Sequence, residues 1–168
     1  MTESDAVSLI DLFETNALSV TIDGGWGVDA LLGRQTREHE DLDIALPEVE
    51  VPSLRRALGE RGYREVWSGD RWECNFVLED AGGRRVDVHS YTLDADGRNL
   101  SGVAYEGRHL TGRGTIGGRA VRCVPPPVVL EFHAGYELDE NDYHDVRQVC
   151  EAFGLALPAA FERFAKRR

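Results

Sequence analysis

The segment DGGWGVDALLGRQTREHEDLDIAL, from Asp23 to Leu46, begins with two glycines and ends with two aspartates one residue apart. Residues 19–22, just before it, are rich in β-branched side chains and predict a short strand. Residues 26–32 have helical spacing, and Gly33 predicts the end of that helix. Residues 42–46 alternate between apolar and acidic side chains and predict a second strand. The segment therefore predicts a strand, a glycine turn, a helix and a strand in succession.

The two aspartates, Asp41 and Asp43, are two residues apart in the second strand, so their side chains point to the same face. Leu42 and Ile44 then point to the opposite face, toward the core. Two carboxylates this close repel each other unless a cation or a proton compensates them. Magnesium is such a cation, and it usually takes one or two carboxylates together with substrate phosphates. An exposed strand face or ion pairs with nearby arginines would also account for the pattern.

The glycine pair, Gly24 and Gly25, offers bare backbone amides at a helix N-terminus, where phosphate groups commonly bind. Taken alone, the pair also fits an ordinary tight turn. If the strands on either side of the helix are neighbours, the phosphate-binding backbone and the acidic pair converge. That arrangement suits phosphoryl or nucleotidyl transfer, which depends mainly on positioning and charge neutralisation.

A third acid, Asp87, lies between Val86 and Val88 in the alternating stretch RRVDVHSY. If this strand lies beside residues 42–46, Asp87 joins the acidic pair. Three acids can hold two magnesium ions, and the third can also accept a proton from an attacking hydroxyl. A surface charge paired with a neighbouring arginine is the alternative.

The whole chain predicts an α/β (α+β) protein with a mixed β-sheet flanked by helices. No internal repeat or linker divides it, so we expect one domain over residues 1–168, with a helical C-terminal segment from about residue 126. Residues 94–118 predict loops with one irregular hairpin. The remaining predicted elements are a helix over 4–16 capped by Ser4 or Asp5, a helix over 51–61, strands over 63–68, 72–78, 84–91 and 120–124, a turn at 80–83, and helices over 128–134, 141–153 and 158–166.

The composition indicates which classes of partner and which compartment are favoured. A formal net charge of −11 over 168 residues disfavours nucleic acid and favours small cations, metal ions or polyamine-like substrates, although acidity can also serve solubility alone. The three cysteines are widely spaced, so we expect no zinc site or disulfide framework and a reducing cytoplasm. The sequence predicts no signal peptide and no membrane span.

Four motifs occur in an order that resembles the small antibiotic nucleotidyltransferases. They are the Gly-Gly-Trp start, the Arg-Glu-His before D-x-D, the later V-D-V-H, and the block FHAGYELDENDYHDVR. The chain is most similar to short-type lincosamide nucleotidyltransferases and aminoglycoside 2″-adenylyltransferases, within the superfamily of DNA polymerase beta. The resemblance spans about Ile10 to Phe153 and implies a nucleotidyltransferase fold. The wider superfamily favours a small hydroxyl residue where this chain has Trp26, but the antibiotic-modifying branch shares the tryptophan.

The resemblance implies an enzyme that moves AMP from magnesium-bound ATP to a hydroxyl of an antibiotic and releases pyrophosphate. Asp41 and Asp43 would ligate two magnesium ions, and Asp87 would ligate one of them and act as the general base. Gly24 and Gly25 would cradle the triphosphate. Two further residues, Arg37 and His39, could touch phosphate, although they could equally balance the charge of neighbouring acids.

The acceptor is expected to be a small hydroxylated cation, either a lincosamide or an aminoglycoside. The candidate contacts are Glu73, His89, Tyr136 and Glu137, although the acids of the C-terminal block also fit a helix-capping role. One small domain supplies half a cleft, so a homodimer that completes the pocket is left open. Two other functions also stay open: a protein-modifying nucleotidyltransferase of the antitoxin type and a catalytically silent nucleotide-binding homologue.

Overall fold

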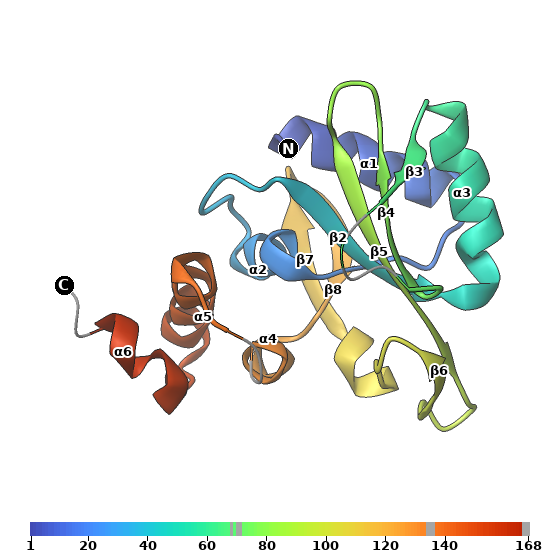
Figure 1. Ribbon diagram of the computed structural model, residues 1–168. Coiled ribbons are helices and arrows are strands. Elements are labelled where there is room, and N and C mark those ends of the chain that lie inside the picture. Colours follow the sequence, from blue (N-terminus) through green and yellow to red (C-terminus); the bar gives the residue numbers. More distant parts are fainter. Residues whose placement is uncertain (68, 70–71, 134–136, 166–168) are drawn as a thin grey trace.

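A mixed β-sheet organises the chain (Figure 1). The computed structural model describes residues 1–67, 69, 72–133 and 137–165, and eight strands within these residues form one sheet in the order β3-β4-β5-β2-β1-β8-β7, with β6 paired to β5. The strands are β1 Thr21–Ile22, β2 Asp41–Pro47, β3 Arg64–Val66, β4 Asn75–Glu79, β5 Arg85–Leu93, β6 Asn99–Gly102, β7 Gly112–Ile116 and β8 Arg119–Cys123.

Helices cover one face of the sheet and one of its ends (Figure 1). The helices are α1 Glu3–Thr15, α2 Gly24–Leu32, α3 Val51–Glu60, α4 Pro126–Phe132, α5 Glu140–Phe153 and α6 Glu162–Ala165, with 3₁₀ segments at Glu48–Glu50, Gly107–Leu110 and Ala159–Phe161. The mixed sheet flanked by helices is the predicted architecture. Among the described residues, no helix has the length and apolar character needed to cross a bilayer.

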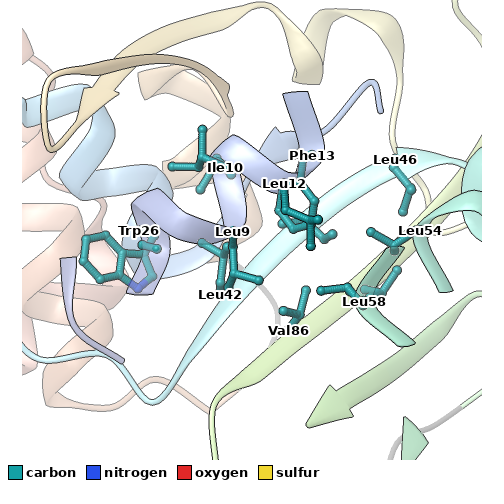
Figure 2. Packing of buried hydrophobic residues seen from close by; sticks show 14 of the residues in the cluster. Leu9, Ile10, Leu12, Phe13, Trp26, Leu42, Leu46, Leu54, Leu58 and Val86 are labelled. Atoms are coloured by element: carbon teal, nitrogen blue, oxygen red, sulfur yellow. The ribbon is translucent and has the colours of Figure 1, made fainter. Parts of the chain in front are cut away.

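The main core lies between the sheet and the first three helices. Figure 2 shows Leu9 and Phe13 of α1 packed with Leu42 of β2, Leu58 of α3 and Val86 of β5. These side chains are at most 5% exposed, and their burial stabilises the packing of the helices on this face. The opposite face of β2 and β5 carries the polar side chains, as the period-two alternation of both strands predicts.

The C-terminal helices α4, α5 and α6 lie away from α1 and α3, beside α2 (Figure 1). Val28 of α2 packs with Val128 of α4 and Val149 of α5 in a separate apolar cluster. This cluster attaches the C-terminal helical segment, which begins at Pro126, to α2.

Most predicted elements are present, with a few differences. The helix at the N-terminus is capped by Thr2 rather than by Ser4 or Asp5, because Thr2 and Asp5 form a reciprocal capping box. The glycine pair does not precede α2 but forms its first turn, and Gly33 ends the helix in a left-handed conformation as predicted. The predicted element ends at Ser68, Ala134 and Lys166 lie outside the described residues.

Residues 94–118 contain more order than predicted, since β6 and β7 both lie there. Strand β7, GRGTI, has too few apolar residues to show a pattern, and it is defined by its antiparallel pairing with β8. Its Gly114 lies against the backbone of α2, where a Cβ atom would overlap the carbonyl oxygen of Ala30.

We predict that Gly114→Ala lowers the free energy of unfolding by about 1–3 kcal/mol, because α2 must move away from β7 to admit the methyl group. Urea unfolding measures the change. Gly59→Ala is the matched control, since Gly59 lies within α3 with only Arg64 Nη1 near the new methyl group, at 4.0 Å. This control should leave stability unchanged or raise it by up to about 1 kcal/mol. Equal effects of the two substitutions would contradict the close packing of α2 on β7.

Candidate active site

Asp43 and Asp87 face each other on adjacent strands. Strands β2 and β5 are parallel neighbours, and Asp43 is the register partner of Asp87. His89, two residues further along β5, places its Nε2 3.7 Å from Asp43 Oδ1 and 3.9 Å from Asp87 Oδ1. One ligand atom from each of these three residues lies within 4.8 Å of the others, which is a spacing that one metal ion can bridge.

Asp41 shares the face of Asp43 but is not part of that three-residue group. Burial, together with the charges of Asp43 and Asp87, raises the pKa of Asp41 to about 6. The site therefore holds more negative charge than its own side chains compensate. A divalent cation with oxygen ligands fits this excess, because it would neutralise several carboxylates at once.

His89 supplies part of that compensation. Burial disfavours its charged form, but the interaction of its Nε2 with the Asp43 carboxylate and the charges of Asp87 and Asp43 outweigh burial and raise the pKa of the imidazole. We predicted His89 as an acceptor contact. In the structure His89 lies next to Asp43 and Asp87, so a contact between His89 and the acceptor would be made beside these two carboxylates.

The N-terminus of α2 meets this acidic group at Gly24. A Cβ atom at Gly24, where φ is +56°, would overlap Asp43 Oδ2, so only glycine allows the two elements to approach. The amide of Gly24 is already engaged, since it donates to Oδ1 of Asp23 at 2.8 Å. The next two amides, of Gly25 and Trp26, have no intrahelical partner by position, and no described side chain caps them.

The cap residue Asp23 is held from a distant part of the chain. Its Oδ2 accepts a hydrogen bond of 2.5 Å from the Tyr105 hydroxyl. Burial raises the pKa of Asp23 against the effect of this hydrogen bond, and burial together with the charge of Asp23 holds the pKa of Tyr105 well above its usual range. Tyr105 therefore stays a donor and fixes the end of α2.

The side chains of Arg37 and His39 converge beside Gly25. A Cβ atom at Gly25 would overlap Nδ1 of His39 and Nη2 of Arg37. Arg37 forms a bidentate pair with Asp145 of α5, with Nε to Oδ1 at 3.0 Å and Nη2 to Oδ2 at 2.6 Å. His39 Nε2 lies 2.5 Å from Oδ2 of the buried Asp29. A guanidinium and an imidazole thus lie next to the open helix amides, which is an arrangement suited to an anion.

Gly25 and Arg37 line a pocket of about 430 Å³ between the sheet and the C-terminal helices, whereas Asp41, Asp87 and His39 are not among its lining residues. The pocket is lined by Asp23, Gly24, Gly25, Arg37, Asp43, His89, Phe132, His133, Asp142 and Asp145. The last four of these residues come from α4, α5 and the segment between them, so the C-terminal helices complete the site.

Three predicted acceptor contacts do not line this pocket as described. Glu73 is exposed in the turn before β4, and Glu137 is exposed before α5, where it lines a separate hollow with Arg163 and Phe164. Tyr136 lies outside the described residues.

The sequence did not predict the residues that contact the site from distant parts of the chain. Asp29 and Tyr105 carry no local pattern that signals a site. Asp145 belongs to the C-terminal acidic block, for which a helix-capping role was one alternative, and Asp139 of that block is the N-cap of α5. The spacing D-x-x-D-x-x-D, which puts one acid of the block on the buried face of α5, was the available signal.

Comparison with known proteins agrees with the family resemblance of the sequence motifs. A family model described as aminoglycoside-2″-adenylyltransferase matches residues 6–149. A lincosamide resistance protein of Staphylococcus haemolyticus is 31% identical over 156 residues, which are 89% of this chain and 94% of that protein. A 2″-aminoglycoside nucleotidyltransferase of Escherichia coli is 31% identical over 109 residues, which are 63% of this chain and 58% of that protein.

Two solved structures share the fold. The crystal structure of the lincosamide antibiotic adenylyltransferase LnuA with lincomycin bound matches with a TM-score of 0.76 and 27% identity, covering 89% of this chain and 96% of that one. The crystal structure of ANT(2″)-Ia in complex with adenylyl-2″-tobramycin matches with a TM-score of 0.70 and 22% identity, covering 90% and 89%. The second likeness is one of fold alone.

The fold and its facing acids define a nucleotidyltransferase. The chain belongs to the aminoglycoside-2″-adenylyltransferase family, because the family model covers most of its length. The resemblance seen in the sequence motifs is thereby confirmed, and its relatives are lincosamide and aminoglycoside adenylyltransferases that act on antibiotics.

We predict that Asp41→Asn raises the thermal midpoint by a few degrees at pH 7 in metal-free buffer. The pKa of Asp41 is about 6 in the folded state, above the ordinary 3.8, so this group costs the wild type stability as the pH rises between those values. The variant should lack that loss and match the wild type near pH 4. A variant less stable than the wild type at pH 7 would show that Asp41 is not repelled by its neighbours.

Proposed function

We propose that this enzyme transfers AMP from magnesium-bound ATP to a hydroxyl of a lincosamide or aminoglycoside antibiotic and thereby inactivates the drug. The observation that carries the proposal is the pairing of Asp43 with Asp87 opposite the bare N-terminus of α2. The relatives that share the family act on these two classes of drug, which supports the acceptor.

Asp41, Asp43 and Asp87 are the proposed ligands of two magnesium ions. The pKa of Asp41, which burial and then the charges of Asp43 and Asp87 raise, supports this assignment. Bound magnesium would neutralise the triphosphate and stabilise the negative charge that develops on the transferred phosphoryl group.

The remaining chemistry belongs to residues of this chain. The acceptor oxygen forms a bond to the α-phosphorus, the bond from that phosphorus to the bridging oxygen breaks, and pyrophosphate leaves. Asp87 is the proposed general base for the acceptor proton. The amide of Gly25, the guanidinium of Arg37 and the imidazole of His39 are the proposed donors to phosphate oxygens. Gly24 contributes space rather than a donor, since its amide caps onto Asp23.

A lincosamide is the acceptor that the comparisons favour. The lincosamide resistance protein aligns over 94% of its length, whereas the aminoglycoside enzyme aligns over 58%. Glu73, Tyr136 and Glu137 stay predicted contacts to the acceptor, and His89 is a proposed contact from the acidic group. The cationic amine of either drug suits a protein of net charge −11.

The setting of the reaction is also a proposal. We infer that residues 1–168 work as one nucleotidyltransferase domain, because α5 contributes Asp145 to the same pocket as β2 and α2. Its need for ATP suits the cytoplasm. A homodimer would close the open side of the pocket, and the sedimentation of the protein with and without drug tests it.

Incubation with α-labelled ATP, magnesium and a panel of lincosamides and aminoglycosides tests the function directly. Label on a drug supports the proposal. Label only on a co-purified protein would support an antitoxin-type enzyme instead, and nucleotide binding without transfer would support a silent homologue.

We predict that Asp43→Asn lowers the rate of AMP transfer by about 10³-fold or more, since it removes a central metal ligand. The steady-state rate with saturating ATP and drug measures the loss, with the circular dichroism spectrum as the folding control. Asp87→Ala should retain nucleotide binding and lose transfer. Transfer at the wild-type rate in either variant would refute the roles assigned to these carboxylates.

Gly25→Ala should weaken the binding of a nonhydrolysable ATP analogue, because the new methyl group displaces His39 and Arg37 from the helix end. We expect about a tenfold or greater rise in the dissociation constant by calorimetry. Gly83→Ala is the control, because nothing lies within 4 Å of the added methyl group and its strain at φ +77° falls on a hairpin turn outside the pocket. Unchanged affinity in Gly25→Ala would argue against phosphate binding at this end of α2.

A further inference from the structure

We propose that Asp145 of α5 is a positioning residue, which holds the guanidinium of Arg37 against the N-terminal end of α2 as a donor to bound phosphate. The inference rests on the proposed nucleotide binding and deepens it, because it gives the C-terminal helices a defined part in that binding. Asp145 and Arg37 both line the pocket beside Gly25, although they are 108 residues apart in the sequence.

The carboxylate of Asp145 binds one edge of the guanidinium. Nε of Arg37 donates to Oδ1 at 3.0 Å and to Oδ2 at 3.2 Å, and Nη2 donates to Oδ2 at 2.6 Å. On another side, Nη1 donates to the backbone carbonyl of Glu38 at 3.0 Å. A planar guanidinium that is bonded on two sides has little freedom to turn. The position of the Arg37 head group is therefore set by α5 together with the neighbouring backbone.

Part of the guanidinium stays available for a ligand. The group carries five N–H donors, and the contacts above use one at each nitrogen. Within the described residues, one N–H of Nη1 and one N–H of Nη2 thus have no hydrogen-bond partner. Nη2 lies beside the helix end, since a Cβ atom on Gly25 would be 2.5 Å from it. A phosphate oxygen at this end of α2 can therefore accept from Nη2 and from the amide of Gly25 together.

Asp145 is devoted to this one partner. It is 2% exposed, and among the described residues Arg37 is the side chain that donates to it. Burial disfavours the charged form of Arg37, but the hydrogen bond and the charge of Asp145 outweigh burial and raise the pKa of the guanidinium. An apolar contact of similar volume would often attach α5 at least as well. The charged pair adds what an apolar contact lacks, which is a fixed cation at the edge of the pocket.

Orientation and charge act in opposite directions on nucleotide affinity. The negative charge of Asp145 weakens the attraction of Arg37 for phosphate. Without Asp145, however, the guanidinium would be free to turn toward the other carboxylates that line the pocket, which are Asp23, Asp43 and Asp142. Orientation is the larger effect, because a donor that is already in place needs no rearrangement when phosphate binds.

Asp145→Asn tests the inference. The substitution keeps the volume but places an amide NH₂ opposite a guanidinium N–H, so one side of the bidentate contact is lost. We expect the dissociation constant of a nonhydrolysable ATP analogue and the Michaelis constant for magnesium-ATP to rise about tenfold or more. The Michaelis constant for the drug should change less. A lowered constant for the nucleotide would show that charge outweighs orientation and would overturn the inference.

The same substitution in an Arg37→Gln background shows whether Asp145 acts through Arg37. With the guanidinium absent, Asp145→Asn should change the dissociation constant of the ATP analogue by less than about twofold. A tenfold effect in this background would mean that Asp145 acts independently of Arg37, and the inference would be wrong.

Val149→Ala is the matched control for the attachment of α5. Val149 is fully buried in the apolar cluster that joins α5 to α2, and it does not line the pocket. The variant should lower the thermal midpoint at least as much as Asp145→Asn does, while the dissociation constant of the ATP analogue changes by less than about threefold. If Val149→Ala weakens nucleotide binding as much as Asp145→Asn does at equal loss of stability, Asp145 only attaches the helix and the inference fails.

The outcomes separate this inference from the proposed function. If the wild type transfers AMP and Asp145→Asn leaves the Michaelis constant for ATP unchanged, the inference is wrong and the function stands. If the wild type binds the ATP analogue but transfers no AMP, the proposed function fails and calorimetry still decides the role of Asp145. If the wild type binds no nucleotide, both are wrong.

Asp145→Glu replaces Asp145→Asn if the latter does not fold. It keeps the charge and displaces the carboxylate by one methylene group, which moves the guanidinium from its place beside Gly25. A weaker affinity for the ATP analogue then supports the inference, because misplaced donors bind less well. An unchanged affinity overturns it.

Discussion

The parallel pairing of β2 with β5 is the constraint on which the site depends, because it places Asp43 opposite Asp87. Like charges opposite each other on one face of a sheet destabilise it. The opposite face supplies the compensation, since the aliphatic side chains that alternate with these acids are fully buried under α1 and α3. A slip of one residue would move those side chains into solvent. Apolar burial on one face therefore holds the acids together on the other.

The two glycines lie against different groups of the site. On the side of Gly24, the carboxylate of Asp43 approaches the helix backbone. On the side of Gly25, Arg37 and His39 approach it. Under the proposed function, the magnesium ions of a bound nucleotide would lie at the carboxylates and its phosphate groups would lie beside Arg37 and His39. The segment from Asp23 to Leu46 has glycines at one end and aspartates at the other, and the two ends are in contact, since Gly24 lies against Asp43.

The sequence predicted the parts of the site that depend on local periodicity. The alternation within each strand predicted that Asp43 and Asp87 point away from the core, and their proximity was predicted only on the condition that the two strands are neighbours, which they are. Gly33 predicted the end of α2. The sequence could not predict β7, because a glycine-rich strand shows no apolar alternation and exists through its pairing with β8. Nor could it assign Asp29 a partner, because the contact with His39 spans the loop between α2 and β2 and exists only after the two elements pack.

Asp29 holds His39 and Asp145 holds Arg37, but the helices that carry these two carboxylates are attached to the sheet to different extents. Asp29 belongs to α2, which packs against the sheet through the main core, so the orientation of His39 is as stable as that core. Asp145 belongs to α5, which joins the sheet domain through the small cluster around Val149 and through the pair with Arg37. Asp145 also lines the pocket, so under the proposed function a phosphate bound at Arg37 would share the guanidinium with it. The position of the Arg37 side chain depends on the docking of α5, and on that proposal the C-terminal helices would take part in nucleotide binding as well as in the acceptor pocket.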